Sequence, residues 1–121
     1  MILLCGHGKY GETIKNSVEM IAGKQDNIFS IDFTEEMSVT DIIEQYNKRI
    51  AFAEDEVSIY CDIPGGSPAN AALLTKKNSN GIRVFTGLNL SMMLSLVMGE
   101  SIENSLIGAK ESIKLFSILS P

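Results

Sequence analysis

A chain of 121 residues, 45% of them hydrophobic and 21% charged, has the size and composition of one globular domain and not of a disordered segment. Its formal net charge of −5 argues against a nucleic-acid-binding protein, whose contact surface would be basic. No apolar run approaches the roughly 20 residues of a membrane-spanning helix, and no signal-peptide pattern opens the sequence, so we expect one cytoplasmic domain over residues 1–121.

Short apolar runs alternate with amphipathic stretches along the first half of the chain. The run Met1–Cys5 is continuous and stops at Gly6, which is typical of a strand buried on both faces. A stretch with apolar residues at helical spacing follows and ends at Gly23, a predicted C-terminal cap. We expect a second strand over Ile28–Phe33 and then a helix whose N-cap is Ser38.

The second half continues the alternation. Val57–Cys61 predicts a third strand, and Ser67 and Pro68 predict the start of a helix, because serine caps well and proline suits the first helical position. The remaining expected elements are a fourth strand over Ile82–Thr86, helices over Ser91–Met98 and Ser101–Glu111, and a fifth strand over Ile113–Ile118. This order predicts an α/β fold with a mostly parallel sheet and helices on both faces.

Ligands of such sheets bind at the carboxyl ends of the strands, so the residues after the first strand are candidates. They read Gly6-His7-Gly8, and His7 is the only histidine in the chain. A lone histidine is more often structural than catalytic. However, the glycines on either side of His7 let other groups approach its ring closely. The position of His7 at a strand end predicts an exposed nucleophile or general base.

The segment after the third strand carries the second candidate group. It contains Asp62 and then Gly65-Gly66 directly before the helix start at Ser67. Paired glycines at a helix start leave backbone N–H groups directed outward, which predicts an anion site. If the first and third strands are neighbours, Asp62 comes within reach of His7. A histidine oriented by a carboxylate and facing a phosphate cradle is typical of a phosphoryl carrier.

Other functions fit parts of the same pattern. The segment Gly6–Gly11 matches GxGxxG, and Asp32 follows about 20 residues on, as in dinucleotide-binding proteins, but the chain has no room for a catalytic domain. Asp62 also lies where a receiver domain is phosphorylated, but no acidic pair follows the first strand to hold Mg²⁺. A non-catalytic regulatory domain stays open. We expect no metal and no cofactor, and we expect Cys5 and Cys61 to be reduced packing residues.

Three separated motifs resemble the mannose-class enzyme IIA (EIIA) domain of the bacterial sugar phosphotransferase system. They are Gly6-His7-Gly8, Asp62 followed by Gly65–Asn70, and Gly87–Leu94, where Ser91 stands in place of the family's usual proline. The resemblance covers nearly the whole chain. It implies that His7 is phosphorylated, that Asp62 is its partner, and that the turn Gly66, Ser67 and Pro68 lies beside the phosphate.

The resemblance also implies partners and architecture. A member of this family accepts phosphate from phospho-HPr and passes it to a IIB component, which phosphorylates a sugar entering through membrane IIC and IID components. Members are homodimers in which a C-terminal strand crosses to the partner's sheet, and Ile113–Ile118 suits that role. The implied fold is a three-layer sandwich with four mostly parallel strands plus a C-terminal antiparallel strand. Related domains donate phosphate in dihydroxyacetone kinase systems, but they generally lack the GGSPxN pattern.

Overall fold

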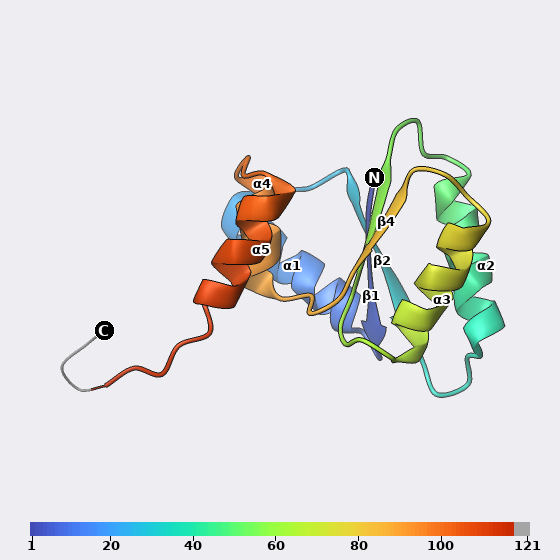
Figure 1. Cartoon of the computed structure of the whole chain (residues 1–121), viewed down its shortest axis with the longest axis horizontal. Helices are drawn as coiled ribbons and strands as arrows, with labels where there is room; N and C mark the ends of the chain where they lie inside the picture. Colours follow the sequence, from blue (N-terminus) through green and yellow to red (C-terminus); the bar gives the residue numbers. More distant parts are fainter. Residues whose placement is uncertain (118–121) are drawn as a thin grey trace. The chain divides into compact units, whose positions relative to one another are not determined.

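The computed structural model describes residues 1–117, which contain four strands and five helices (Figure 1). In chain order they are β1 (Ile2–His7), α1 (Tyr10–Ala22), β2 (Ile28–Phe33), α2 (Val39–Ile50), β3 (Val57–Cys61), α3 (Ser67–Lys77), β4 (Ile82–Phe85), α4 (Leu90–Val97) and α5 (Ile102–Glu111). The chain separates into two compact units, residues 1–88 and residues 89 onward, so the single domain over 1–121 stays a prediction. No helix within residues 1–117 is long and apolar enough to cross a lipid bilayer.

The first unit is built on one parallel sheet. Its strands lie in the order β2-β1-β3-β4, and each neighbouring pair runs parallel. Helix α1 covers one face of the sheet, and α2 and α3 pack together on the other face (Figure 1). The predicted α/β fold with four parallel strands and helices on both faces is therefore confirmed. The order also makes β1 and β3 direct neighbours, which is the condition for His7 and Asp62 to meet.

The main core lies between this sheet and the two helices α2 and α3. Helix α3 contributes Ala69, Ala71 and Ala72, all buried, whose small side chains let the helix approach the strands closely. Cys5 and Cys61 lie opposite each other in the sheet, and both are free and buried. Burial raises the pKa of Cys5 to about 12 and that of Cys61 to about 11, so both thiols keep their protons. The expected burial of both cysteines is confirmed, and their role as packing residues stays a prediction.

The predicted N-cap residue is correct for α2 and wrong for α3. Ser38 caps α2 through a reciprocal pair of hydrogen bonds with Asp41, as expected for a capping box. The N-cap of α3, however, is Gly66 and not Ser67, whose side chain makes no capping hydrogen bond. The carbonyl of Gly66 already accepts the first helical bond, from the N–H of Asn70 at 2.9 Å. Ser67 is therefore the first helical residue and Pro68 the second.

The second unit packs α4 against α5. Asn89 caps α4 by accepting the backbone N–H of Met92, so the helix begins at Leu90, one residue before the expected Ser91. The segment that follows α5 was expected to form a strand over Ile113–Ile118. Residues 113–117 belong to no strand of this chain, and residue 118 lies outside the described residues. The apolar side chains of this segment are exposed: Ile113 82%, Leu115 99% and Phe116 60%.

Candidate functional site

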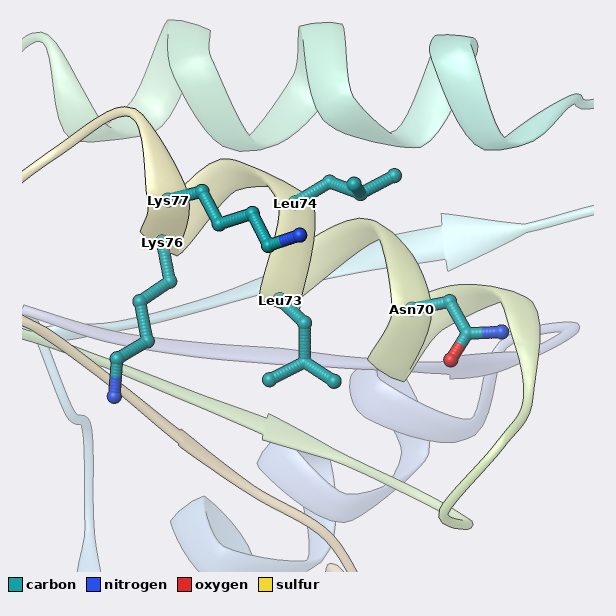
Figure 2. Close-up of a pocket in the computed structure, with 5 residues that line it drawn as sticks. All are labelled: Asn70, Leu73, Leu74, Lys76 and Lys77. Atoms are coloured by element: carbon teal, nitrogen blue, oxygen red, sulfur yellow. The ribbon is translucent and has the colours of Figure 1, made fainter.

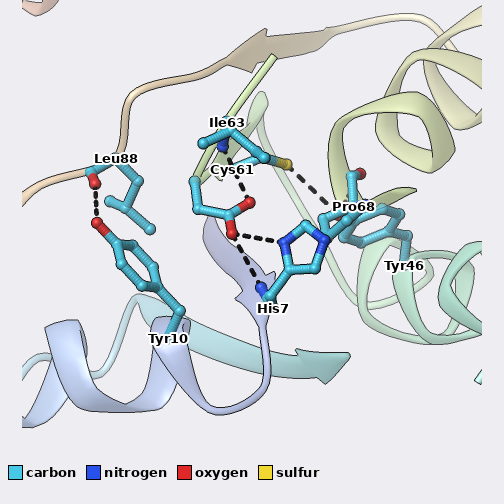
Figure 3. A network of polar contacts seen from close by, with 8 residues as sticks. His7, Tyr10, Tyr46, Cys61, Ile63, Pro68 and Leu88 are labelled. Atoms are coloured by element: carbon cyan, nitrogen blue, oxygen red, sulfur yellow. Dashed lines mark hydrogen bonds and ion pairs between the residues drawn. The ribbon is translucent and has the colours of Figure 1, made fainter. Parts of the chain in front are cut away.

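His7 and Asp62 meet at the carboxyl end of the sheet. His7 is the last residue of β1, and Asp62 directly follows the neighbouring strand β3. Nδ1 of the His7 ring lies 2.7 Å from Oδ2 of Asp62, one of the contacts drawn at His7 in Figure 3. Two residues separated by 55 positions in the sequence are thus brought into direct contact, as predicted from the expected strand order.

The carboxylate of Asp62 is held by three hydrogen bonds. Its Oδ2 accepts the backbone N–H of His7 at 3.0 Å in addition to the ring contact, and its Oδ1 accepts the N–H of Ile63 at 3.0 Å. Only 11% of the side chain is exposed. This burial raises the pKa of Asp62, but the hydrogen bonds from His7 and Ile63 outweigh it and leave the pKa below its ordinary value.

An ionised Asp62 fixes the tautomer of the histidine. A carboxylate only accepts hydrogen bonds, so Nδ1 of His7 must carry the proton that points at Oδ2. In the neutral imidazole the other ring nitrogen, Nε2, then keeps its lone pair. Because 51% of the His7 side chain is exposed, the ring in its neutral form can present Nε2 to a reacting group.

Phe33, at the end of β2, is a site residue that the sequence analysis missed. Its ring contacts the imidazole of His7 edge to face, with the centroids 5.5 Å apart and the planes at 77°. Its backbone exchanges two hydrogen bonds with Gly8, at 2.7 and 3.1 Å, and Gly8 has a φ of 63°, which favours glycine. The predicted strand Ile28–Phe33 already places this residue at the carboxyl end of the sheet. Its apolar side chain, however, has no reactive group by which the sequence alone could identify it as part of a site.

An open pocket of about 550 Å³ lies beside the imidazole. It is lined by His7, Gly8, Phe33, Thr34, Glu35 and Glu36. Its size gives a reacting group room to reach the ring.

The glycine turn before α3 packs against the histidine, as the sequence indicates. Gly65 has a φ of 78°, and Gly66 is so close to the ring that an added Cβ would lie 3.1 Å from Cε1 of His7. Because α3 begins here, the N–H groups of Ser67 and Ala69 have no acceptor inside the helix. Pro68 has no N–H and is buried, so it shapes the turn without donating. The turn can therefore offer N–H groups to an anion held on His7.

The third sequence motif also reaches the site, through its backbone. The N–H of Gly87 donates to the carbonyl of Asp62 at 3.1 Å, and the N–H of Leu88 donates to that of Cys61 at 3.0 Å. The carbonyl of Leu88 in turn accepts the hydroxyl of Tyr10 at 2.6 Å (Figure 3). These bonds hold the chain on both sides of the Asp62 side chain.

The GxGxxG pattern has a packing explanation in this fold. An added Cβ at Gly6 would lie 2.8 Å from Cβ of Tyr10, and one at Gly11 would collide with the carbonyl of Leu4. Within residues 1–117 no group of three His, Cys, Asp or Glu side chains is placed to hold a metal ion.

Comparisons with known proteins agree with one another. The family model described as "PTS system fructose IIA component" matches residues 1–114. The mannose-specific EIIAB component of Escherichia coli K12 is 31% identical over 99 residues, which is 80% of this chain and 31% of that protein. The sorbose-specific EIIA component of Klebsiella pneumoniae is 32% identical over 96 residues, or 78% of this chain and 70% of that protein. A crystal structure of phosphotransferase system component EIIA from Streptococcus agalactiae superposes with a TM-score of 0.86 at 27% identity, covering 95% of both chains.

Proposed function

The chain belongs to the mannose-class EIIA family of the sugar phosphotransferase system, and we propose that it carries a phosphoryl group on His7 during sugar uptake. The observation that supports this most directly is the 2.7 Å contact between Nδ1 of His7 and the carboxylate of Asp62, which leaves Nε2 free to react. The matched relatives are phosphotransferase components, so neither a dihydroxyacetone kinase domain nor a dinucleotide-binding module is favoured.

In the proposed reaction the lone pair of Nε2 attacks the phosphorus of phospho-HPr. A P–N bond forms on His7, and the P–N bond on HPr breaks with its electron pair returning to the HPr ring. Positive charge develops on the His7 imidazole as the new bond forms, and Asp62 stabilises it through the proton on Nδ1. The phosphoryl group then passes to a nucleophilic side chain of a IIB component by the same kind of exchange.

The turn before α3 is the proposed site for the phosphate oxygens. Gly66 lies against the His7 ring, and the N–H groups of Gly66 and Ser67 stand at the positive end of α3. Such a helix end stabilises an anion by roughly 0.3–1 kcal/mol per charge. This contribution is modest, so the turn orients the phosphoryl group more than it binds it.

We also propose a cytoplasmic homodimer in which residues 113–118 of one protomer pair with the edge strand β4 of its partner. The exposed apolar segment 113–116 needs a cover, and in the sheet formed within residues 1–117 β4 is an edge strand that pairs with β3 alone. Helix α3, which packs on β4, carries an apolar pocket of about 610 Å³. Its lining residues are Asn70, Leu73, Leu74, Lys76 and Lys77 (Figure 2). Leu73 is 50% exposed there, which suits contact with the partner's segment.

Phosphoryl transfer is tested by incubating the protein with radiolabelled phosphoenolpyruvate, enzyme I and HPr. We expect an acid-labile, base-stable label on the wild type. His7→Ala should take up no label, because the chain has no second histidine. Label persisting on His7→Ala would overturn the assignment of this residue. The IIB and membrane IIC and IID partners are proposed from the family alone.

A further inference from the structure

Tyr46 of α2 connects the two segments that carry the site. Its side chain is fully buried, with 0% exposure. Its hydroxyl donates to the carbonyl of Pro68 at 2.9 Å, and Oη lies 3.6 Å from Sγ of Cys61 (Figure 3). Pro68 belongs to the first turn of α3, and Cys61 directly precedes Asp62. One hydroxyl therefore reaches both the anion-binding turn and the strand end that holds the carboxylate.

Elementary chemistry decides which atom donates in the contacts of this hydroxyl with Pro68 and Cys61, beside which the Cys5 side chain also interacts with it. A tyrosine has one O–H proton, and the Pro68 carbonyl can only accept, so that proton points at Pro68. The thiol of Cys61 then supplies the proton of the longer contact with Oη. Burial raises the pKa of Tyr46 far above the physiological range, which keeps the hydroxyl protonated. Such a satisfied buried network holds its members in one arrangement.

The first turn of α3 has little freedom to move without affecting the histidine. An added Cβ at Gly66 would lie 3.1 Å from the His7 ring, so the turn already lies against the imidazole. A shift toward the ring collides with it, and a shift away withdraws the N–H groups of Gly66 and Ser67. The bond from Tyr46 to Pro68 fixes the turn two residues from Gly66, at a point buried under the site.

We propose that Tyr46 is a positioning residue for phosphoryl transfer, which holds the first turn of α3 at the correct distance from His7. The inference rests on the proposed function of His7. Tyr46 has no exposed surface and so contacts no partner protein. Its loss should therefore slow the chemical step and leave the binding of phospho-HPr unchanged. A misplacement of about 1 Å in a reacting site costs up to about 10²-fold in rate, so a partly released turn should cost roughly 10-fold.

The test is Tyr46→Phe, which removes only the hydroxyl, compared with Tyr60→Phe. Tyr60 is a matched control because it is also buried, at 1% exposure, and its ring stacks on Phe85. The first measurement is the rate of His7 phosphorylation as a function of phospho-HPr concentration. Tyr46→Phe should lower the maximal rate roughly 10-fold without moving the half-saturating concentration, and Tyr60→Phe should change neither.

The second measurement needs no phosphoryl transfer. Amide resonances of Gly66, Ser67 and Ala69 in the unphosphorylated protein should shift in Tyr46→Phe and not in Tyr60→Phe. Equal rates and equal amide resonances in the two variants would overturn the inference, and so would equal losses of rate and melting temperature in both. If the wild type takes up no label, the proposed function fails, and the amide resonances still decide separately whether Tyr46 holds the turn.

Discussion

Replacing Asp62 by asparagine keeps the shape of the side chain and removes its charge, and we expect either orientation of the new amide to disturb the site. If the amide oxygen takes the place of Oδ2 and accepts from His7, the NH₂ group faces the N–H of Ile63, and two donors oppose each other. If the amide is turned round, its NH₂ group faces both the backbone N–H and Nδ1 of His7. The ring proton must then move to Nε2, which is the nitrogen needed for attack.

The size of the effect follows from the charge that Asp62 supplies. Opposite unit charges roughly 4 Å apart at an effective dielectric near 20 attract by about 4 kcal/mol before desolvation is subtracted. That energy corresponds to about 10³-fold in rate. This rate factor lies within the range of about 10²–10⁴-fold that one positioned proton-handling group typically contributes. We therefore expect Asp62→Asn to slow phosphorylation of His7 by 10²–10⁴-fold.

The assay is single-turnover labelling of His7 by phospho-HPr, with Asp32→Asn as the matched control. Asp32 lies opposite Gly6 on the neighbouring strand β2, so the control makes the same chemical exchange beside the site. Asp32→Asn should label at nearly the wild-type rate. Wild-type speed in Asp62→Asn would refute the reasoning and remove Asp62 from the mechanism.

The same substitution has a signature in stability against pH. The pKa of Asp62 is lowered in the folded protein, so its ionised form stabilises the fold above its ordinary value of about 3.9. That stabilisation is lost as the pH falls through the lower folded value. Urea unfolding should show Asp62→Asn to be less stable than the wild type at pH 7, with the gap closing in acid. A gap independent of pH would mean that the carboxylate is not stabilised by its hydrogen bonds.

Two further predictions concern the turn and the assembly. Gly66→Ala places a methyl group 3.1 Å from Cε1 of His7, so the ring must tilt. Labelling of His7 should therefore slow roughly 10-fold in a folded protein, and an unchanged rate would show that the turn and the ring are not closely fitted. A chain ending at Glu111 lacks the exposed apolar segment, so sedimentation velocity should show loss of the dimer or of folding; a stable dimer of the shortened chain would place the interface elsewhere.

The sequence indicates that His7 and Asp62 lie together because both follow apolar runs typical of neighbouring strands. His7 follows the apolar run Met1–Cys5 and Asp62 follows Val57–Cys61, and the second of these runs coincides with β3. The parallel order then brings the strand ends together. The start of α3 was misjudged because Ser67 is a good cap in general. Here the extended backbone of Gly66 already provides the first helical acceptor.

Residues that hold the reactive groups in place were harder to predict, for a physical reason. In the sequence, Phe33 and Tyr46 look like ordinary members of apolar patterns, and their contacts with His7 and Pro68 appear only when the elements are brought together. A fifth strand over Ile113–Ile118 poses the same difficulty, since a strand forms only where it has an edge to pair with, and none of the four strands within residues 1–117 includes this segment.

The arrangement also explains why the chemistry depends on positions that carry no reactive group. In the proposed mechanism the contact of Nδ1 with Asp62 keeps Nε2 of His7 available for attack, and Asp62 is oriented by the N–H groups of His7 and Ile63. In the proposed reaction the phosphate site depends on Gly66 staying against the ring. The bond from Tyr46 to Pro68 holds that turn together with the bond from the Asn70 side chain to the carbonyl of Gly65. A change at a buried hydroxyl is therefore expected to slow transfer on an exposed histidine.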